Sequence, residues 1–501
     1  MPVVMRGAII AVLPIQNAMF LSSIALTIAS LNEIIALMAI WTPRLAGRRG
    51  PKYLQIVEAL AEDIASGALP PGTRLPPHRE LAYALDVSPN TTSRAYGEGV
   101  ARALIQGEVG RGTFVRAPGG ARLVGDPADM RRPRTGPIDF SRNLPCPALA
   151  ATALAEALTA LGRDARLEAF TDYQTENDIA HHTDAAIAWL NRSGIAADRP
   201  EVIVTNGAQH GILCALMAAT RPGDLLLSEA LTYAPIKAMA HRLGLKLTPV
   251  PLDDEGLCPD ALDEVCRSRS PTALYLTPTL QTPTTATMTA ERRARIAEIA
   301  QKRNLTLIED DVFGYLKPDR PQPIAALAPE RTVYVTSTSK CLAPGLRVGY
   351  VRAAASVAKA VHHAVGLTCW MPAPLMVEIA ARWIADGTAE RLTNMQRAHA
   401  ADRQAAAAAV FADYEMNADP HGLHLWLNLP PGCSADTVRA EAATRGVQII
   451  DGAAFSVDPG ARPNAVRLCL SHEPDRRRLM QGLETLQAIL SEGATDASLV
   501  I

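Results

Sequence analysis

The stretch 331–350, RTVYVTSTSKCLAPGLRVGY, holds residue types that suit the capture of an aldehyde bearing a phosphate. An apolar, β-branched run from Thr332 to Thr336 predicts a short buried strand, and Lys340 follows at its carboxyl end. A lysine amine there forms a Schiff base with an aldehyde when it is partly desolvated or close to another cation. The Ser337 hydroxyl and the Arg347 guanidinium suit a phosphate dianion. The alternative is an ordinary buried strand followed by a loop lysine.

Three further places carry residues that offer or need a charged partner. Residues 205–211 follow a predicted strand with a glycine turn that opens a helix, and helix N-termini bind anions. Asp310 and Asp311 end another predicted strand, where adjacent acids also suit a metal ion, although no histidine lies nearby in sequence. Arg467 interrupts an apolar strand and needs a partner there, of which a buried structural ion pair is one form.

Short apolar strands alternate with helical stretches from Ile138 onward. This alternation predicts a mainly parallel sheet covered by helices. Ligands of such sheets bind beyond the carboxyl ends of the strands, where most of the residues above fall. The predicted strands are Val202–Thr205, Leu225–Ser228, Leu245–Thr248, Ala273–Thr277, Thr306–Ile308, Val333–Thr336 and Arg347–Val351.

The sequence pattern over about residues 50–117 predicts a small DNA-binding domain. Helical periodicity runs from Tyr53 to Ser66, a second helix covers His78–Leu85, and Ser88 is expected to cap a third. Two short strands follow around a Gly-Arg-Gly tip in GEVGRGTFV. A helix whose first residues face outward is the geometry that enters a major groove. Basic and acidic residues balance in this segment, so charge gives no support, and a small protein-interaction module is the alternative.

Composition places the chain among globular, multidomain proteins, with 501 residues and a net charge of −2. Its eight cysteines form no Cys-x-x-Cys pair, so neither a zinc site nor a disulfide framework is indicated, and reduced thiols in the cytoplasm fit best. The apolar residues 1–41 suggest a signal anchor or membrane helix. Glu33 makes it a poor one, and we favour a later start at Met38, with no membrane association expected.

Residues 70–96, PPGTRLPPHRELAYALDVSPNTTSRAY, and the following GRGTFV closely resemble the winged helix-turn-helix of the GntR family. The resemblance implies double-stranded DNA as a partner. Pro89 departs from the family, which often has a basic residue there. The candidate DNA contacts that the resemblance implies are Arg74, Arg79, Asn90, Thr91, Arg94 and Arg111.

The Ser-x-x-Lys of residues 337–340, followed by Pro-Gly-x-Arg-x-Gly, resembles the active-site segment of fold-type I pyridoxal 5′-phosphate enzymes. The resemblance implies that Lys340 holds the cofactor as an internal aldimine. Asp310, with Asp311 as the alternative, would pair with the pyridinium nitrogen and keep it protonated. The protonated ring can then accept electron density from the reacting bonds. Arg467 would bind a substrate carboxylate. The other cofactor-binding candidates are Gly207, Ala208, Gln209, Tyr233, Thr282, Phe313, Ser337, Arg347 and Tyr173, the last reaching the phosphate of a partner subunit in a homodimer.

Several positions depart from the usual residues of these enzymes. Thr282 stands where an asparagine is usual and Phe313 where a tyrosine is usual, and those two residues normally hydrogen-bond the 3′-oxygen of the cofactor. Their loss is expected to change the pKa of the aldimine and to weaken catalysis or cofactor affinity. Asp178 replaces a usual glycine and His182 a usual arginine.

A GntR-type DNA-binding domain fused to an aminotransferase-like domain is the architecture of the MocR-type regulators. The resemblance implies a cytoplasmic, DNA-binding transcriptional regulator that senses an amino compound by aldimine exchange at Lys340. An active aminotransferase acting on an amino acid is the alternative, and a degenerate domain that only dimerises is a third hypothesis. No metal ion is expected. The expected division is an apolar extension (1–41), a winged helix-turn-helix domain (42–117), a linker (118–137), a mainly parallel α/β domain of fold type I (138–490) and a tail (491–501).

Overall fold

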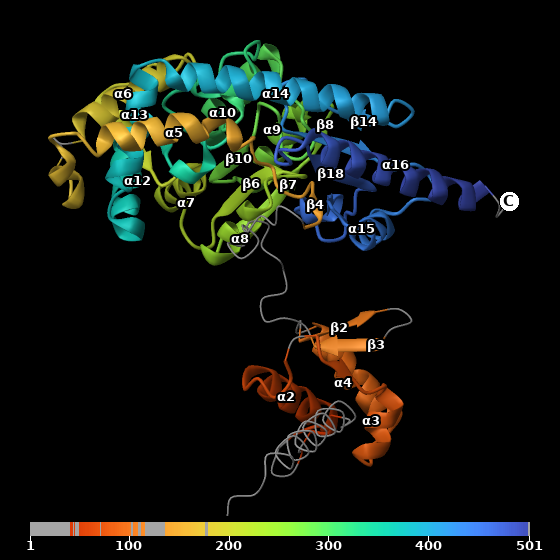
Figure 1. Cartoon of the computed structure of the whole chain (residues 1–501). Helices are drawn as coiled ribbons and strands as arrows, with labels where there is room; N and C mark the ends of the chain where they lie inside the picture. The colour runs from red at the N-terminus through yellow and green to blue at the C-terminus, as the bar shows by residue number, and fades with distance from the viewer. Residues whose placement is uncertain are drawn as a thin grey trace, which may run out of the picture. The chain divides into compact units, whose positions relative to one another are not determined.

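The chain forms two compact units, residues 1–122 and 123–501 (Figure 1). The computed structural model describes residues 41–43, 45, 50–70, 72–101, 104–108, 112–115, 136–175 and 179–498. Nearly all of the expected N-terminal extension, most of the expected linker, and the residues Arg111 and Asp178 lie outside the described residues.

The N-terminal unit is the predicted winged helix-turn-helix, with one strand more than predicted. Its buried core joins Ile56 and Leu60 of the first helix to Leu81 of the second and Ala95 of the third. The strand that the sequence did not predict, Arg74–Leu75, pairs with the second strand of the wing. The elements are α2 (Lys52–Ala65), β1 (Arg74–Leu75), α3 (His78–Ala84), α4 (Pro89–Ala101), β2 (Ile105–Glu108) and β3 (Gly112–Val115), with sheet order β1-β3-β2.

Side-chain caps and one glycine fix where these helices begin and end. The Ser88 hydroxyl accepts a hydrogen bond from the Thr91 amide at 3.2 Å, as expected of an N-cap. The Thr92 hydroxyl, one residue further, donates to the His78 carbonyl at 2.7 Å and so ties α4 to the start of α3. After α2, Gly67 has φ +79°, a left-handed conformation that favours glycine at a helix C-terminus.

A seven-stranded sheet forms the centre of the large unit, and all seven predicted strands belong to it. Its order is β5-β13-β12-β11-β10-β6-β7, and β13 alone runs antiparallel to its neighbours. The sheet is therefore mainly parallel, as predicted. The strands are β5 (Val202–Thr205), β6 (Leu225–Glu229), β7 (Lys246–Val250), β10 (Ala273–Leu276), β11 (Thr306–Asp310), β12 (Thr332–Ser337) and β13 (Gly349–Arg352).

Alternation along the strands gives this sheet two apolar faces. Leu226, Tyr275 and Ile308 pack in the core that includes α7 (Ala208–Ala219). Their sequence neighbours face the other way and pack with α9 (Pro259–Arg269) and α10 (Ala290–Arg303). Because apolar side chains and helices cover both faces of the sheet, polar groups can gather only at the ends of its strands.

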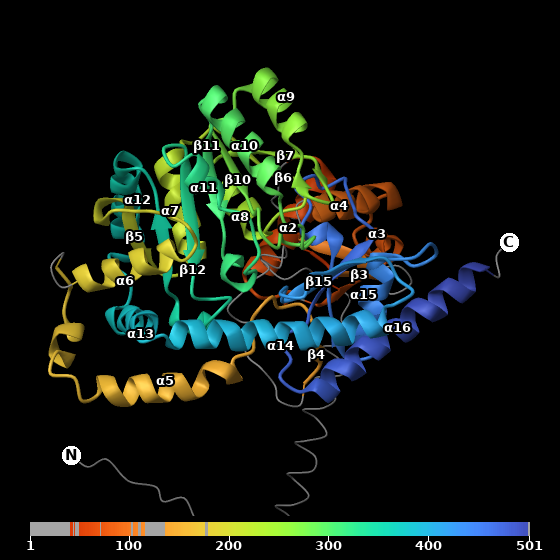
Figure 2. The ribbon, with the colours of Figure 1, turned by 90° about the horizontal axis from the view of Figure 1, so that it is seen from above.

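A second, smaller sheet lies towards the C-terminus in the order β14-β15-β18-β17. Its core includes Phe411, Leu425, Leu468 and Leu483. Figure 2 shows α14 running from α13 to α16, so that one helix spans both parts of the unit. Helix α16 continues past residue 491, where the tail was expected to begin, and ends at Ser498. The elements here are α14 (Thr388–Val410), β14 (Met416–Asn417), β15 (His424–Asn428), α15 (Ala435–Thr444), β17 (Ile450–Asp451), β18 (Ala465–Cys469) and α16 (Arg476–Ser498).

Shorter elements complete the large unit. They are β4 (Ile138–Asp139), α5 (Ala148–Leu161), α6 (Ala180–Asn191), α8 (Pro235–Arg242), β8 (Leu252–Asp253), β9 (Gly256–Leu257), α11 (Ile324–Leu327), α12 (Ala355–Cys369), α13 (Pro374–Ala385) and β16 (Val447–Gln448), which pairs with β4. Within the described part of the chain, no helix combines the length and the apolar character needed to cross a membrane.

The carboxyl ends of β5, β6, β10, β11 and β12 lie along one edge of the large sheet, since these strands share one direction. Asp310 ends β11 and Ser337 ends β12. The antiparallel β13 begins at the same edge, where Gly349 pairs with both Ser337 and Thr205. A Cβ atom on Gly349 would lie 2.5 Å from the carbonyl carbon of Gly207. The glycine therefore lets the turn after β5 approach β13.

Gly349→Ala is expected to destabilise the large unit, because the added methyl group meets backbone that cannot move aside. Overpacking of this kind costs about 1–3 kcal/mol, measured as a lower midpoint of thermal unfolding. The matched control is Gly345→Ala, where a Cβ would meet nothing within 4 Å. Equal midpoints for the two variants would contradict the argument.

Candidate functional site

Lys340 lies just beyond β12, with its amine held at the strand edge. Its Nζ donates a hydrogen bond to the Asn143 carbonyl and lies 5.3 Å from the centre of the Phe313 ring. Burial lowers the pKa of Lys340 to about 8, and the nearby charges of Arg467 and Arg347 act in the same direction. A larger fraction of this amine than of an exposed lysine is therefore neutral, and thus nucleophilic, near neutral pH.

The Asp310 carboxyl group lies close enough to Lys340 for the two charges to interact. The Tyr275 hydroxyl on β10 donates to its Oδ2 at 2.7 Å. Burial raises the pKa of Asp310 to about 6, against the opposing effect of that hydrogen bond. The adjacent Asp311 is engaged elsewhere, because it pairs with the Arg320 guanidinium at 2.7 Å. Of the two acids, Asp310 is thus the one positioned at the site.

The turn after β5 brings backbone and a guanidinium together. Gly207 has φ +80°, and a Cβ atom there would lie 2.7 Å from Nη2 of Arg347. That Nη2 donates to the Asn206 carbonyl at 3.1 Å. Among the residues that the structure describes, no side chain caps the N-terminus of α7, where Ala208 and Gln209 form the first turn. The uncapped N–H groups and the arginine make this turn suited to an anion.

Two more of the predicted residues join this group. The Tyr233 hydroxyl donates to Oε1 of Gln209 at 3.4 Å. Burial raises the pKa of Tyr233, and the charges of Asp310, Arg347 and Arg467 also influence it. The Ser337 side chain is fully buried at the end of β12, where its hydroxyl accepts a hydrogen bond from the Ser339 amide at 3.3 Å.

Arg467 reaches the group from the second sheet. It lies on β18, is buried, and donates from Nη2 to the Ser141 carbonyl at 2.6 Å. Its guanidinium carbon lies 4.7 Å from the centre of the Phe455 ring, and its Nε has no hydrogen-bond partner in the described part of the chain. Among the described residues no carboxylate forms a salt bridge with it, so the structural ion pair considered from the sequence is not observed. The unused N–H leaves capacity for a ligand.

The remaining three candidates differ in their surroundings. Thr282 and Phe313 are both buried, and the Phe313 ring lies 5.8 Å from the ring of His424. Tyr173 is 70% exposed, and its ring packs 5.8 Å from that of Trp370, which is 69% exposed. Two exposed aromatic rings side by side suit contact with another protein surface.

Comparison with known proteins identifies the two units. Residues 52–115 match the bacterial regulatory proteins of the gntR family, and residues 136–483 match aminotransferase class I and II. The HTH-type transcriptional regulator YdeF of Bacillus subtilis is 30% identical over 454 residues, covering 90% of this chain and 97% of YdeF. The probable rhizopine catabolism regulatory protein MocR of Rhizobium meliloti is 27% identical over 385 residues, 70% of this chain and 75% of MocR.

The chain belongs to the MocR-type regulators of the GntR family. A GntR-type DNA-binding domain is fused to an aminotransferase domain, and the regulators among its relatives favour transcriptional regulation over the aminotransferase alternative. A solved structure of LysN, an alpha-aminoadipate aminotransferase from Thermus thermophilus, has a TM-score of 0.67 and 24% identity over 80% of this chain and 99% of its own. That likeness shows the fold-type I architecture.

In the winged helix of this MocR-type regulator, most predicted DNA contacts are exposed. The exposed residues are Arg74, Arg79, Asn90 and Arg94. Thr91 is half-buried, and its hydroxyl group forms a hydrogen bond with that of Ser88. Arg94 is oriented by α2, because its guanidinium carbon lies 4.0 Å from the centre of the Tyr53 ring and its Nη2 donates to the Tyr53 hydroxyl at 3.2 Å. The Arg74 side chain lies against Gly112 of the wing.

The sequence analysis missed four residues of the regulator's site. Tyr275 holds Asp310, Asn143 holds Lys340, and Nδ1 of His424 accepts a hydrogen bond from Nδ2 of Asn143 at 3.0 Å. Glu229, the fourth, ends β6 fully buried, with Oε2 accepting from the Thr277 hydroxyl at 2.8 Å and Oε1 unpartnered. Of the four, only Glu229 stood at a position that gave a signal in the sequence, because it ends a strand.

The buried carboxyl group of Glu229 is expected to make the free energy of unfolding depend on pH. Burial raises its pKa from 4.5 to about 8. Between these values the folded chain holds a proton that the unfolded chain has released, so stability falls as pH rises through this window. Glu229→Gln should remove a slope of up to about 1.4 kcal/mol per pH unit, measured by urea unfolding between pH 5 and pH 8.

The matched control for this measurement is Glu298→Gln, which changes an exposed glutamate on α10. It should keep the wild-type slope. Parallel slopes for wild type and Glu229→Gln would show that the buried carboxyl group is ionised throughout the window.

Proposed function

We propose that this regulator binds pyridoxal 5′-phosphate at the site around Lys340 and senses an amino compound there, in the cytoplasm, to control DNA binding. The observation that carries the proposal is the Lys340 amine, with its pKa of about 8, among the charges of Asp310 and Arg467. A desolvated lysine, a buried carboxyl group and an arginine with an unused N–H are what a cofactor aldehyde, its ring nitrogen and an amino acid carboxylate require.

The residues present fit the cofactor. Its phosphate would lie at the uncapped N-terminus of α7, with the backbone of Gly207, Ala208 and Gln209 and the guanidinium of Arg347 as donors, and a Cβ on Gly207 would collide with that guanidinium. Ser337 is the further phosphate candidate. Asp310, oriented by Tyr275, would hold the proton of the ring nitrogen, and Tyr233 would stack on the ring.

When bound, the cofactor supplies an aldehyde carbon that reacts reversibly with amines. Lys340 provides the resident amine, and its low pKa lets it release and regain a proton near neutral pH. Arg467 would select ligands that carry a carboxylate, because its Nε is buried and unpartnered. Phe313 carries no hydroxyl, so it cannot donate to the 3′-oxygen, which favours binding over efficient turnover.

The proposal includes a homodimer, supported by the exposed pair Tyr173 and Trp370. Tyr173 would contact the phosphate bound by a second copy of the chain, as the family resemblance implies. A monomer in sedimentation equilibrium, with the cofactor present, would argue against this part of the proposal.

Lys340→Ala is expected to abolish the visible absorbance band that the wild-type protein acquires with pyridoxal 5′-phosphate, because the covalent link is lost. An amino compound that shifts the wild-type band should change the affinity for DNA over the same concentration range. Lys359→Ala, at an exposed lysine on α12, is the control and should behave as wild type. Sensing is refuted if amines shift the band without changing DNA affinity, or if amino and keto acids are turned over robustly.

Arg94→Ala is expected to weaken binding to a duplex that the wild-type protein selects from random sequence. An ordered arginine at the start of a recognition helix is worth about 1–3 kcal/mol, roughly 5- to 150-fold in affinity, measured by fluorescence anisotropy at fixed salt. Lys52→Ala removes an exposed cation from the start of α2 and should change affinity little. An equal loss in both variants would indicate general charge attraction instead of a specific contact.

A further inference from the structure

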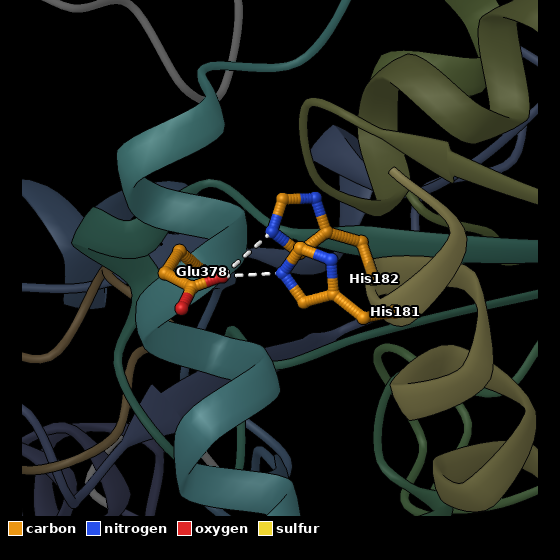
Figure 3. A group of neighbouring side chains, drawn as sticks. All are labelled: His181, His182 and Glu378. Carbon is orange, nitrogen blue, oxygen red and sulfur yellow. Dashed lines mark hydrogen bonds and ion pairs between the residues drawn. The ribbon is translucent and has the colours of Figure 1, made fainter. Parts of the chain in front are cut away.

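Two adjacent histidines on α6 converge on one carboxylate of α13. The Nε2 atoms of His181 and His182 lie 2.7 Å and 3.0 Å from the same oxygen, Oε2 of Glu378. Figure 3 shows both imidazole rings pointing from α6 towards this carboxylate. The donor atoms of these three side chains all lie within 4.8 Å of one another. Within the described part of the chain, no other group of three or more histidine, cysteine or acidic side chains is as close.

We propose that His181, His182 and Glu378 form a binding site for a divalent transition-metal ion, with Zn²⁺ as the ion it suits best. Two imidazole nitrogens and one carboxylate oxygen are a donor set that Zn²⁺ accepts, leaving its fourth position to water. Imidazole also favours Zn²⁺, Cu²⁺ or Ni²⁺ over Mg²⁺ and Ca²⁺, which prefer oxygen ligands. The site is separate from the proposed cofactor residues and does not depend on the function proposed above.

Each of the two histidine nitrogens lies at nearly the distance from the Glu378 oxygen that a tetrahedral ion requires. Bonds of about 2.0–2.1 Å place tetrahedral ligand atoms about 3.3 Å apart. The two nitrogen–oxygen distances, 2.7 Å and 3.0 Å, need to lengthen by only a few tenths of an ångström. Binding through Nε2 requires each neutral ring to carry its proton on Nδ1, so it needs no net loss of protons from the histidines.

The other oxygen of Glu378 is held in place by two arginines. Arg382 donates from Nε to Oε1 at 2.7 Å, and Arg166 donates from Nη2 to the same atom at 3.1 Å. Hydrogen bonds from the histidines and Arg382 hold the pKa of Glu378 well below its usual range, against the effect of burial. Such partners orient a ligand carboxylate and keep it ionised.

The positive charges of these two arginines are balanced by two carboxylates. Asp164 forms ion pairs with both Arg166 and Arg382. Two cations therefore face two carboxylates before any ion binds. The histidines add no charge when neutral, so a divalent ion enters a neutral group.

The site is open on one side. A cavity of about 490 Å³ is lined by His181, Glu378, Arg382 and Asp184, among others. His181 is 43% exposed, whereas His182 and Glu378 are 3% and 2% exposed. Two ligands are thus fixed by packing, while the exposed third ligand and the cavity provide an entry path and room for a water ligand.

An ion here would link α6 to α13. Helix α6 follows the segment that carries Tyr173, and α13 follows Trp370, whose ring packs against that of Tyr173. The ion would thus fix the two segments that present these exposed rings. Its effect would be structural, and no reaction is assigned to it.

The test uses the full-length protein, stripped of metal with a chelator and titrated with Zn²⁺ in a calorimeter and with Co²⁺ in a spectrophotometer. Wild type should bind one ion per chain at this site, with d–d bands but no thiolate charge-transfer band, because the ligands are nitrogen and oxygen. His181→Ala and His182→Arg should each weaken this binding more than about tenfold. His182→Arg keeps a partner for Glu378 and so guards against loss of folding.

The matched control is the double variant His362→Ala/His363→Ala, which removes another adjacent histidine pair, both exposed, from α12. It should bind Zn²⁺ as wild type does. Zn²⁺ should also raise the unfolding temperature of wild type and of this control, but not of His181→Ala. Unchanged affinity in His181→Ala and His182→Arg, or thiolate bands with Co²⁺, would overturn the proposal.

Discussion

Desolvation at the carboxyl edge of the parallel sheet is the constraint on which the large unit depends. In water, a lysine amine and an aspartate carboxylate would both be fully ionised at neutral pH. Here burial lowers the pKa of Lys340 to about 8 and raises that of Asp310 to about 6. Burial at this edge thus brings both pKa values closer to neutrality. The edge is also closely packed, since a Cβ atom at Gly207 or Gly349 would meet neighbouring atoms at less than 3 Å.

The site draws on both sheets of the unit. Lys340 and Asp310 come from the large sheet, whereas Arg467 comes from β18, and the loop after β4 supplies the carbonyls of Ser141 and Asn143. In the proposed sensor, an amino compound joined to the cofactor at the edge of the large sheet, with its carboxylate at Arg467, would bridge the two sheets. That bridge is a physical means by which an amino compound could favour one arrangement of the unit over another.

In the proposed sensor, the residues that depart from the usual aminotransferase pattern would face the ring oxygen of the cofactor and leave the phosphate contacts in place. Phe313 presents an apolar ring to the Lys340 amine, 5.3 Å away. Arg347 and the Gly207 turn retain the features that an anion requires. The histidine pair lies on α6, the helix that follows the segment carrying Tyr173 in the sequence. In the proposed dimer, Tyr173 would belong both to the exposed surface of its own copy and to the cofactor site of the second copy.

Local patterns in the sequence determined the two folds and many residues of the site. Strand periodicity located all seven strands of the large sheet, and turn residues placed the winged helix, because both signals act between residues close in the chain. The short strand β1 escaped prediction, since two residues carry no period and its partner β3 lies about 40 residues away. Tertiary structure alone decided that Tyr275 holds Asp310, that Asn143 holds Lys340, and that Asp311 is engaged with Arg320. It also brought His181 and His182 to Glu378, 196 residues further along the chain in the case of His182. Such pairs form only when packing brings distant segments together, and no local spacing in the sequence encodes them.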